Sequence, residues 1–274
     1  MPKYENKCPV HNELDLYNHC SFDCIYCISQ TKDLNINFNF NEEISRIRTL
    51  KSDSNPFYLS PWTDCYHDEE KQNGYTQQIL SELSGRNIPF FVITKSPLVL
   101  RDIDLFKNKD NAFIAISLNS LNNDLTEQLE PGAPSATERK NLIEELVKMK
   151  DVKTVIKIDP VIPGITDNGE LNLLTDWLCK INPTAVTVET LRISTKILTN
   201  MEKHLPANII TSMMQHYPEL SETPIHPYID YRLKILKETA AKFEKAGIKA
   251  SFCKASLPER INEFDCRGGY DYDF

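Results

Sequence analysis

Residues 18–27 read Asn-His-Cys-Ser-Phe-Asp-Cys-Ile-Tyr-Cys, and this short stretch carries three cysteines in the spacing C-x3-C-x2-C. The thiols of Cys20, Cys24 and Cys27 are close enough along the chain to converge on one face. Thiolate sulfur is a soft ligand that suits iron–sulfur clusters. A cubane cluster takes four ligands, so three thiolates leave one iron open to a small molecule. The stretch therefore predicts a metal centre that performs chemistry.

A structural zinc site is the main alternative for these cysteines. Cys8, His11 or His19 could supply a fourth ligand, but structural zinc sites commonly set their ligands as two separated pairs. Disulfide bonds between cysteines this crowded are typical of small secreted domains, whereas this chain is long and shows no secretory signal. A non-catalytic binding module stabilised by zinc or by an iron–sulfur cluster stays open as the alternative to an enzyme.

Charge and hydropathy limit the partners that we expect. The 274 residues include 39 acidic and 31 basic side chains, which gives a formal net charge of -8. Because phosphate binding draws on an excess of Lys and Arg, this balance does not favour nucleic acid as a partner. No apolar run reaches the length that crosses a bilayer, so we expect no membrane partner and a cytoplasmic location.

Short apolar runs alternate with helical patterns along the chain, which predicts a parallel α/β sheet. The cysteine stretch directly follows the first expected strand, at the strand end where α/β folds hold their chemistry. The expected strands cover residues 14–17, 56–60, 90–94, 113–117, 154–158 and 185–189, with 249–253 as a candidate seventh. Helices are expected from Asn41 onward and over residues 69–83, 101–106, 135–150, 171–181 and 228–246, with helical turns or a lid over 192–221.

The cysteine stretch resembles the C-x3-C-x-aromatic-C motif of the radical S-adenosylmethionine (SAM) superfamily, with Tyr26 at the aromatic position. Alternation of strands and helices does not by itself distinguish an open sheet from a barrel. The resemblance implies a partial (βα)6 barrel of the TIM type with the cluster in the loop after its first strand. We expect a single domain over residues 1–274, with its core at about 14–192 and a C-terminal extension at about 193–274.

The resemblance extends to the branch typified by spore photoproduct lyase. It is carried by Ser-Pro-Trp-Thr-Asp at 60–64, Ile-Thr-Lys-Ser-Pro at 93–97, Glu-Pro-Gly-Ala-Pro-Ser at 130–135 and Asp-Pro-Val-Ile-Pro-Gly at 159–164. The branch implies a 4Fe-4S cluster that reductively cleaves SAM, giving a 5'-deoxyadenosyl radical that abstracts hydrogen from a substrate. It also implies an external one-electron reductant such as flavodoxin or ferredoxin. The substrate does not follow from the resemblance.

SAM brings a carboxylate, an ammonium, a ribose and an adenine, so its pocket needs a cation, polar groups and an apolar wall. Lys95 follows a buried strand and is a compact cation, and its counterpart in the lyase family binds the carboxylate. Ser117, at the end of the next strand, resembles the ribose contact of the family, with Asn119 as a further candidate.

Five more residues, together with Tyr26 of the cysteine motif, complete the expected SAM site. Thr63 and Asp64 match a segment near the methionine end of SAM, although Asp64 is equally a candidate helix cap. Val161 and Ile162 would offer backbone and an apolar wall to the adenine, or else belong to the core. Arg192, directly after the sixth strand, is a candidate ligand contact because barrel strand ends face the catalytic mouth.

Acid and base pairs within the resembling segments have a structural interpretation. Glu130 and Arg139 are expected to form an ion pair or a cap, and so are Arg101 and Asp102. None of the four is expected to act as a catalyst.

Two positions depart from the lyase. The lyase has a hydrogen-donating cysteine two residues before the position that Thr63 matches, and this chain has Pro61 there. A tyrosine after the third cluster cysteine of the lyase is Ile28 here. Cys65 is the remaining candidate for a displaced catalytic hydrogen donor. The sequence therefore predicts an enzyme that does not repair thymine photoproducts, with a nucleic-acid lesion lyase as the alternative.

Overall fold

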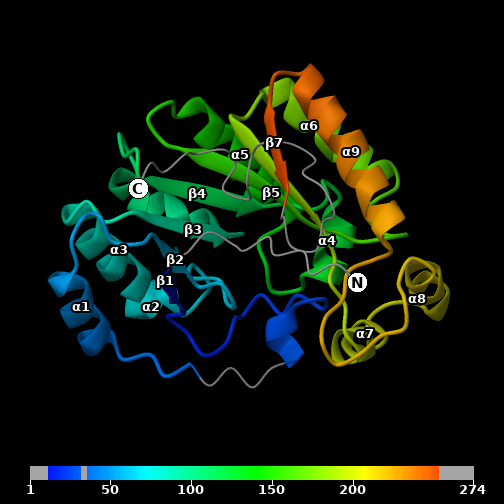
Figure 1. Cartoon of the computed structure of the whole chain (residues 1–274), viewed down its shortest axis with the longest axis horizontal. Coiled ribbons are helices and arrows are strands. Elements are labelled where there is room, and N and C mark those ends of the chain that lie inside the picture. The colour runs from blue at the N-terminus through cyan, green and yellow to red at the C-terminus, as the bar shows by residue number, and fades with distance from the viewer. Residues whose placement is uncertain (1–11, 32–35, 253–274) are drawn as a thin grey trace.

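The computed structural model describes residues 12–31 and 36–252, and their strands form one sheet of seven parallel strands (Figure 1). The strands follow one another across the sheet in chain order, so each connection crosses back to the start of the next strand. This arrangement confirms the predicted partial barrel and the candidate seventh strand. The strands are Asn12–Leu14 (β1), Phe57–Leu59 (β2), Phe90–Thr94 (β3), Ala112–Ser117 (β4), Thr154–Val161 (β5), Ala185–Thr190 (β6) and Lys249–Phe252 (β7).

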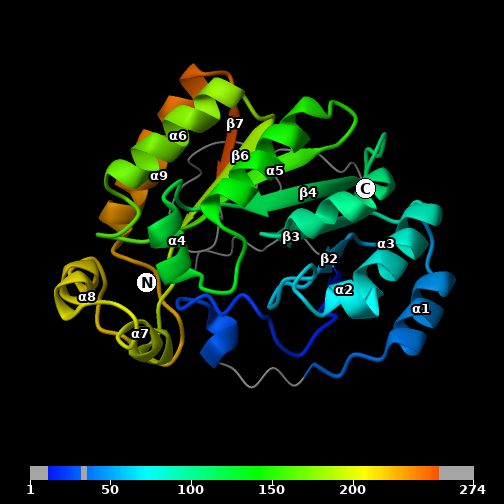
Figure 2. The ribbon, with the colours of Figure 1, turned by 180° about the vertical axis from the view of Figure 1, so that it is seen from behind.

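Helices pack against the outer face of this sheet, and Figure 2 shows α3 and α5 in front of it. Figure 1 shows α1, α2 and α3 at one side of the sheet and α6 and α9 at the other. The α-helices are Phe40–Thr49 (α1), Glu70–Asn73 (α2), Tyr75–Gly85 (α3), Asn123–Leu129 (α4), Ala136–Lys148 (α5), Gly169–Ile181 (α6), Thr195–Met201 (α7), Ala207–Met214 (α8) and Ile229–Lys245 (α9); the 3-10 helices are Ile28–Thr31 (η1) and Pro97–Leu105 (η2).

The first strand differs from its predicted range of residues 14–17. The chain leaves the sheet after Leu14, because the Asp15 carboxylate accepts hydrogen bonds from the backbone N–H groups of Trp62 and Thr63, each at 3.2 Å. These bonds tie the start of the cysteine loop, residues 15–27, to the loop after β2. The apolar residues that suggested a longer strand are buried in the core outside the sheet.

Several helix boundaries also differ from the predictions: the helix expected over residues 101–106, for example, is part of the 3-10 helix η2, which begins at Pro97. Two of the differences have a clear local cause. The cap of α1 is Asn39 rather than Asn41, since the Asn39 side chain accepts from the N–H groups of Asn41 and Glu42. The helix expected over residues 69–83 is two helices, α2 and α3, because Gly74 adopts a left-handed conformation with φ of 62° between them. Neither change moves a candidate site residue.

The core lies on both faces of the sheet. All six residues of β4 and all six of β6 are buried, as expected when helices cover one face and other side chains fill the interior. Inside the barrel, Tyr58, Phe91 and Phe113 occupy paired positions of β2, β3 and β4. Their rings stack with centroid separations of 4.7 and 4.8 Å. On the side formed by β2, β3 and β4, the interior of the barrel is therefore apolar.

The segment predicted as helical turns contains α7 and α8, which pack on the cysteine loop. Ile197 and Met201 of α7 and Met213 of α8 belong to the same hydrophobic cluster as Phe22 and Tyr26. The Asn200 side chain also donates to the backbone carbonyl of Ile25 at 2.9 Å. The C-terminal extension therefore supports the loop that carries the three cysteines.

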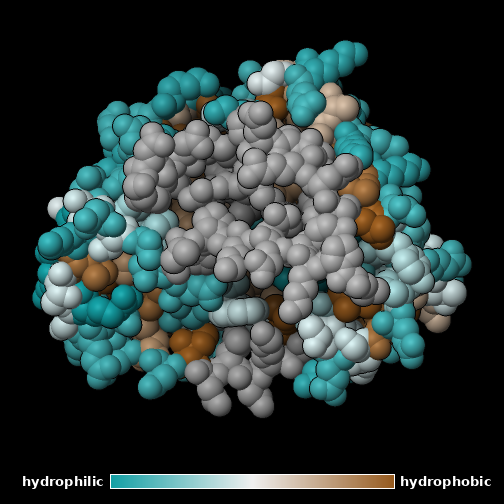
Figure 3. Space-filling model, in the orientation of Figure 1, coloured by the Kyte–Doolittle hydropathy of each residue, from teal (hydrophilic) through white to brown (hydrophobic). Residues whose placement is uncertain are grey.

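On the face shown in Figure 3, the coloured residues are mainly hydrophilic, and the hydrophobic ones lie in small separate groups. Within the residues that the structure describes, no helix has both the length and the apolar character needed to cross a bilayer. Cys8, His11, Cys253 and the tail at 263–274 lie outside the described residues.

Candidate active site

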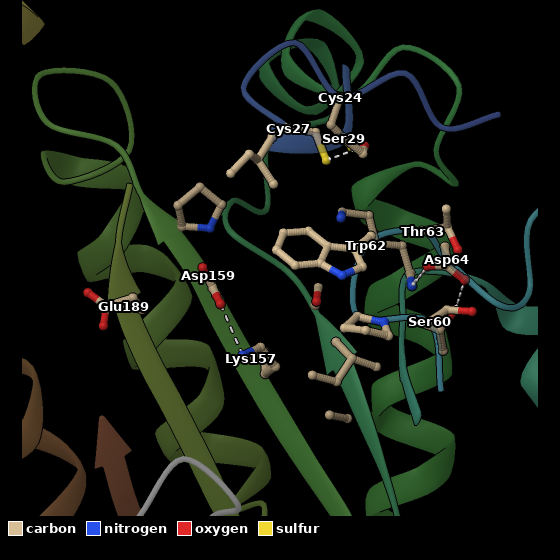
Figure 4. Close-up of a pocket in the computed structure, with 18 of the residues that line it drawn as sticks. Cys24, Cys27, Ser29, Ser60, Trp62, Thr63, Asp64, Lys157, Asp159 and Glu189 are labelled. Carbon is tan, nitrogen blue, oxygen red and sulfur yellow. Dashed lines mark hydrogen bonds and ion pairs between the residues drawn. The ribbon is translucent and has the colours of Figure 1, made fainter. Parts of the chain in front are cut away.

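A cavity of about 420 Å³ opens at the carboxyl ends of the strands. Figure 4 shows Cys24 and Cys27 at one end of it, Trp62 and Thr63 at one side, and Asp159 at the opposite side. Residues from the cysteine loop and from β2 through β6 line this cavity. This is the edge at which parallel α/β barrels assemble their active sites.

All three predicted cluster cysteines line the cavity. Burial and the charge of Asp64 raise the pKa of Cys20 to about 12, and burial also raises the pKa of Cys24. The Cys27 sulfur lies 2.8 Å from the Ser29 hydroxyl oxygen (Figure 4). Without a metal, Cys20 and Cys24 are neutral thiols at neutral pH, so metal binding must release their protons.

This donor set fits a three-thiolate iron–sulfur cluster. The three thiols come from one loop and line one cavity, which Lys95 also lines. The positive charge of Lys95 lowers the pKa of Cys24 and so opposes the effect of burial. Cationic surroundings favour the thiolate form that binds iron. In the described part of the chain, no three His, Cys, Asp or Glu side chains converge on a single ion position.

The cysteine loop is fixed by the segment after α4. The Ile25 N–H donates to the Leu129 carbonyl at 2.9 Å, and the Gly132 N–H donates to the Phe22 carbonyl at 3.1 Å. A Cβ atom at position 132 would lie 2.0 Å from the carbonyl oxygen of Ser21. Only glycine fits this contact, which gives a physical reason for the Glu-Pro-Gly segment at 130–132.

Glu130 forms the centre of a buried polar network behind the cysteines. The Tyr26 hydroxyl donates to Glu130 Oε1, and Arg139 Nη2 lies 2.6 Å from Glu130 Oε2. Lys95 Nζ is 4.0 Å from Glu130 Oε1, and Asn119 Nδ2 is 3.3 Å from the same oxygen. Burial raises the pKa of Glu130, but the charges of Arg139 and Lys95 outweigh it and hold the pKa below its usual value. Glu130 is therefore a carboxylate.

Two of the predicted SAM contacts on β3 and β4 reach the cavity. Lys95 and Ser117 both line it, and the Lys95 side chain is 17% exposed. Burial lowers the pKa of Lys95, but the negative charge that Cys24 carries as a thiolate, together with that of Glu130, raises it above its ordinary value. A cation and a hydroxyl group therefore face the cavity from neighbouring strand ends.

Thr63 and Asp64 also line the cavity, although both make hydrogen bonds within the protein. The Thr63 hydroxyl donates to Asp15 at 3.1 Å. Asp64 accepts from the Thr94 hydroxyl at 2.7 Å and from the Lys95 N–H at 2.9 Å. Because it also accepts from the Tyr66 N–H, Asp64 is a turn residue that joins the loop after β2 to the end of β3. The helix-cap alternative is wrong, since α2 begins only at Glu70.

The structure does not bring every predicted residue to the cavity. Asn119 is buried behind Tyr26 and Glu130, and the side chains of Val161 and Ile162 pack in hydrophobic clusters. Arg192 lines the cavity with an exposed side chain. Cys65 is fully buried in the core and does not line the cavity, so the geometry gives no support for it as a hydrogen donor.

Sequence reasoning missed the polar wall that β5 and β6 present. Lys157 Nζ lies 3.0 Å from Asp159 Oδ2, and both side chains line the cavity (Figure 4). Glu189 of β6 also lines it and pairs with the buried Arg232 of α9 at 3.2 Å. A signal was present, because Lys157 and Asp159 are polar residues two apart in an apolar strand and must share one face.

Sequence similarity to known proteins agrees with this geometry. Residues 14–175 match the family model described as the Radical SAM superfamily. An uncharacterised protein of Methanocaldococcus jannaschii is 27% identical over 161 residues, which cover 56% of this chain and 61% of the relative. A protein of Pseudomonas phage M6 named radical SAM Nα-GlyT isomerase is 25% identical over 179 residues, which cover 62% of this chain and 37% of the phage protein. The chain thus spans less than two thirds of the length of these relatives.

A solved structure shows the same fold. Spore photoproduct lyase complexed with dinucleoside spore photoproduct superposes with a TM-score of 0.62 at 12% identity. The superposition covers 86% of this chain and 74% of the lyase chain. Because the family model matches more than half of the chain and the cysteines that define the motif meet in one cavity, the protein belongs to the radical SAM superfamily.

Proposed function

We propose that this protein is an enzyme that cleaves SAM reductively at a 4Fe-4S cluster held by Cys20, Cys24 and Cys27. The observation that carries the proposal is that all three thiols line one cavity together with Lys95. The cluster and SAM, when bound, supply a one-electron cleavage that yields methionine and a 5'-deoxyadenosyl radical for hydrogen abstraction. A protein of the flavodoxin or ferredoxin type is the expected electron donor.

The residues of the chain bind and orient SAM in this proposal. Lys95 holds the carboxylate, because its ammonium faces the cavity from the end of β3. Ser117, on the neighbouring strand, offers a hydroxyl to the ribose. Thr63 lies near the methionine end. Val161 and Ile162 do not line the cavity and are core residues, which is the other role that the sequence left open for them. Arg192 remains an alternative partner for the carboxylate.

Apolar side chains keep water from the reacting atoms. Phe22, Ile28 and Trp62 line the cavity around the cysteines, and the stacked aromatic rings of β2, β3 and β4 line its interior. A radical that abstracts hydrogen must be shielded from solvent and from other donors, so an apolar cavity suits this chemistry. The Lys157–Asp159 pair and Glu189, which line the opposite wall, are then polar groups that can orient a substrate.

The substrate is not given by the relatives. The phage relative is named for an Nα-GlyT unit, and the lyase structure holds a dinucleoside photoproduct. We propose that this chain shares the SAM cleavage step with them and acts on a different substrate, because Pro61 and Ile28 line the cavity at the two positions where the lyase differs.

Anaerobic reconstitution with iron and sulfide tests the proposal. We expect about four irons and four sulfides per chain, as a cubane cluster requires, with loss of both in Cys24→Ala. Cys179→Ala is the matched control, since Cys179 lies on α6 and does not line the cavity. Stoichiometric zinc in the purified protein, with no iron taken up under reducing conditions, would contradict the proposal and favour the zinc-stabilised binding module.

A further inference from the structure

Glu130 contacts polar side chains from four separate parts of the fold. Tyr26 comes from the cysteine loop, Lys95 from the end of β3, Asn119 from the loop after β4, and Arg139 from α5. Glu130 itself is 1% exposed. A buried carboxylate is costly unless several polar groups satisfy it, and these four do so.

The two cations around Glu130 are not equivalent. Arg139 is fully buried and lies 2.6 Å from the carboxylate, so it neutralises the charge of Glu130. Lys95 is 4.0 Å away and lines the cavity. Glu130 therefore faces two cations, and the charge of Asp64 also acts on Lys95. Of the two cations, Lys95 is the one at the cavity wall, where it can meet an anionic group of a bound molecule.

The same network reaches the other expected SAM contacts. Arg139 Nη1 donates to the backbone carbonyl of Ser117 at 3.2 Å, which holds the end of β4. Two residues after Glu130, the Gly132 N–H donates to Phe22 in the cysteine loop. The residues that would hold the cluster and those that would hold SAM are thus joined through this one side chain.

We propose that Glu130 is a positioning residue that fixes the cysteine loop, through Tyr26, relative to the cation of Lys95. The inference rests on the proposed function. Without the carboxylate, Lys95 and Arg139 repel each other across a buried space, and Tyr26 loses the group that orients its ring. The cluster loop and the SAM carboxylate partner then no longer keep a common geometry, although the three thiols remain.

The chain offers a matched control for a merely structural role. Glu70 is also fully buried, and it accepts hydrogen bonds from the Tyr17 hydroxyl and from Arg101. Tyr17, Glu70 and Arg101 do not line the cavity. Both networks join a tyrosine, a glutamate and an arginine, but only the Glu130 network adjoins the cavity. They also differ in that Arg101 is partly exposed and Glu70 accepts from the N–H groups of Thr76 and Gln77.

The test compares SAM affinity in four anaerobically reconstituted variants: Glu130→Gln, Tyr26→Phe, Glu70→Gln and Tyr17→Phe. The readouts are iron content, the melting temperature, and the dissociation constant of SAM from equilibrium dialysis without reductant. We expect Glu130→Gln to weaken SAM binding about 10- to 100-fold, as loss of a supporting partner does at metal sites. Tyr26→Phe, which removes one hydrogen bond, should weaken it about two- to tenfold.

The Glu70 and Tyr17 variants should lower the melting temperature and leave SAM affinity unchanged. Equal loss of SAM affinity in both networks, or no loss in either, would overturn the inference. If Glu130→Gln does not fold, the comparison of Tyr26→Phe with Tyr17→Phe decides, because neither leaves a buried charge unpaired. A wild-type protein that takes up no cluster or binds no SAM would instead overturn the proposed function, and this inference with it.

Discussion

Gly132 lies against Ser21 so closely that a Cβ atom at position 132 would be 2.0 Å from the Ser21 carbonyl oxygen. The clash is with backbone, so the cysteine loop must move to accept a side chain. We expect Gly132→Ala to cost about 1–3 kcal/mol of stability by overpacking and to reduce cluster uptake. Iron analysis after reconstitution measures the effect. Gly85→Ala is the control, because nothing lies within 4 Å of a Cβ there; equal iron content in the two variants would contradict this account.

Lys95→Ala should weaken SAM binding while the cluster stays intact. A charge-assisted contact to a carboxylate contributes about 1.5–3 kcal/mol, which corresponds to a roughly 10- to 150-fold rise in the dissociation constant. Ser117→Ala should have a smaller effect, because it removes a neutral hydrogen bond. Lys107→Ala, which removes a lysine paired with Asp104 on the surface, is the control.

Equilibrium dialysis of reconstituted protein gives these dissociation constants. Unchanged affinity in Lys95→Ala would place the carboxylate partner elsewhere. Arg192→Ala is then the next variant to measure, since Arg192 lines the cavity and has no ion pair among the described residues.

Most of the fold follows from local sequence signals. The helix at 135–150 has Ser135 and Glu138 as a capping box, which is visible in the sequence and present in the structure. Gly247 has φ of 75° after α9, as expected for a left-handed cap. The first strand was placed two residues late, because its end is set by the bonds from Trp62 and Thr63 to Asp15, and sequence shows no such long-range contact.

Some residues of the candidate site could likewise be predicted from the sequence, whereas their long-range contacts could not. The cysteine spacing predicted the three thiols, and the strand-end positions together with the resemblance to the lyase branch predicted Lys95 and Ser117. Glu130 was expected only as the ion-pair partner of Arg139, and that pair is confirmed. Its hydrogen bond with Tyr26 joins residues 104 positions apart, and Glu130 is buried. No local pattern reports such a contact.

Repair of thymine photoproducts should be absent. Pro61 and Ile28 line the cavity, and neither carries a hydrogen on sulfur or oxygen to return to a product radical. Of the described cysteines outside the motif, Cys65 and Cys179 do not line the cavity either. Reconstituted enzyme with SAM and reductant should yield no restored thymine from a photoproduct-containing oligonucleotide, as measured by mass spectrometry. Repair above trace level would refute this, and its loss in Cys65→Ala would identify Cys65 as the donor.

His226 should make the folded state sensitive to mild acid. Burial, together with the charges of Arg232 and Arg192, lowers the pKa of His226 to about 3, although the charge of Asp159 acts in the opposite direction and Glu189 Oε1 lies 3.8 Å from Nδ1. The folded state therefore binds this proton more weakly than the unfolded chain, whose histidine titrates at a pKa of about 6.5. The stability that neutral His226 contributes is fully present above the unfolded-state pKa. It is lost as the pH falls from the unfolded-state pKa toward the folded-state pKa. Between pH 7.5 and 5, we expect a loss of about 2 kcal/mol.

Anaerobic urea unfolding at several pH values measures this dependence. His226→Gln should lose less stability than wild type over the same range, because its side chain does not titrate. His204→Gln is the control, since His204 is exposed on the surface. A pH dependence that is the same in wild type and His226→Gln would show that other groups cause it.

Reductive cleavage of SAM is the most direct test of the central claim. Reconstituted wild-type protein, given SAM and dithionite without oxygen, should form 5'-deoxyadenosine and methionine, measured by liquid chromatography and mass spectrometry. Cys20→Ala, Cys24→Ala and Cys27→Ala should each reduce the product to background, because a three-thiolate site cannot lose a ligand, while Cys179→Ala should match wild type. Formation of no 5'-deoxyadenosine by a protein with a full complement of iron and sulfide, or equal formation by the three cysteine variants, would contradict the account.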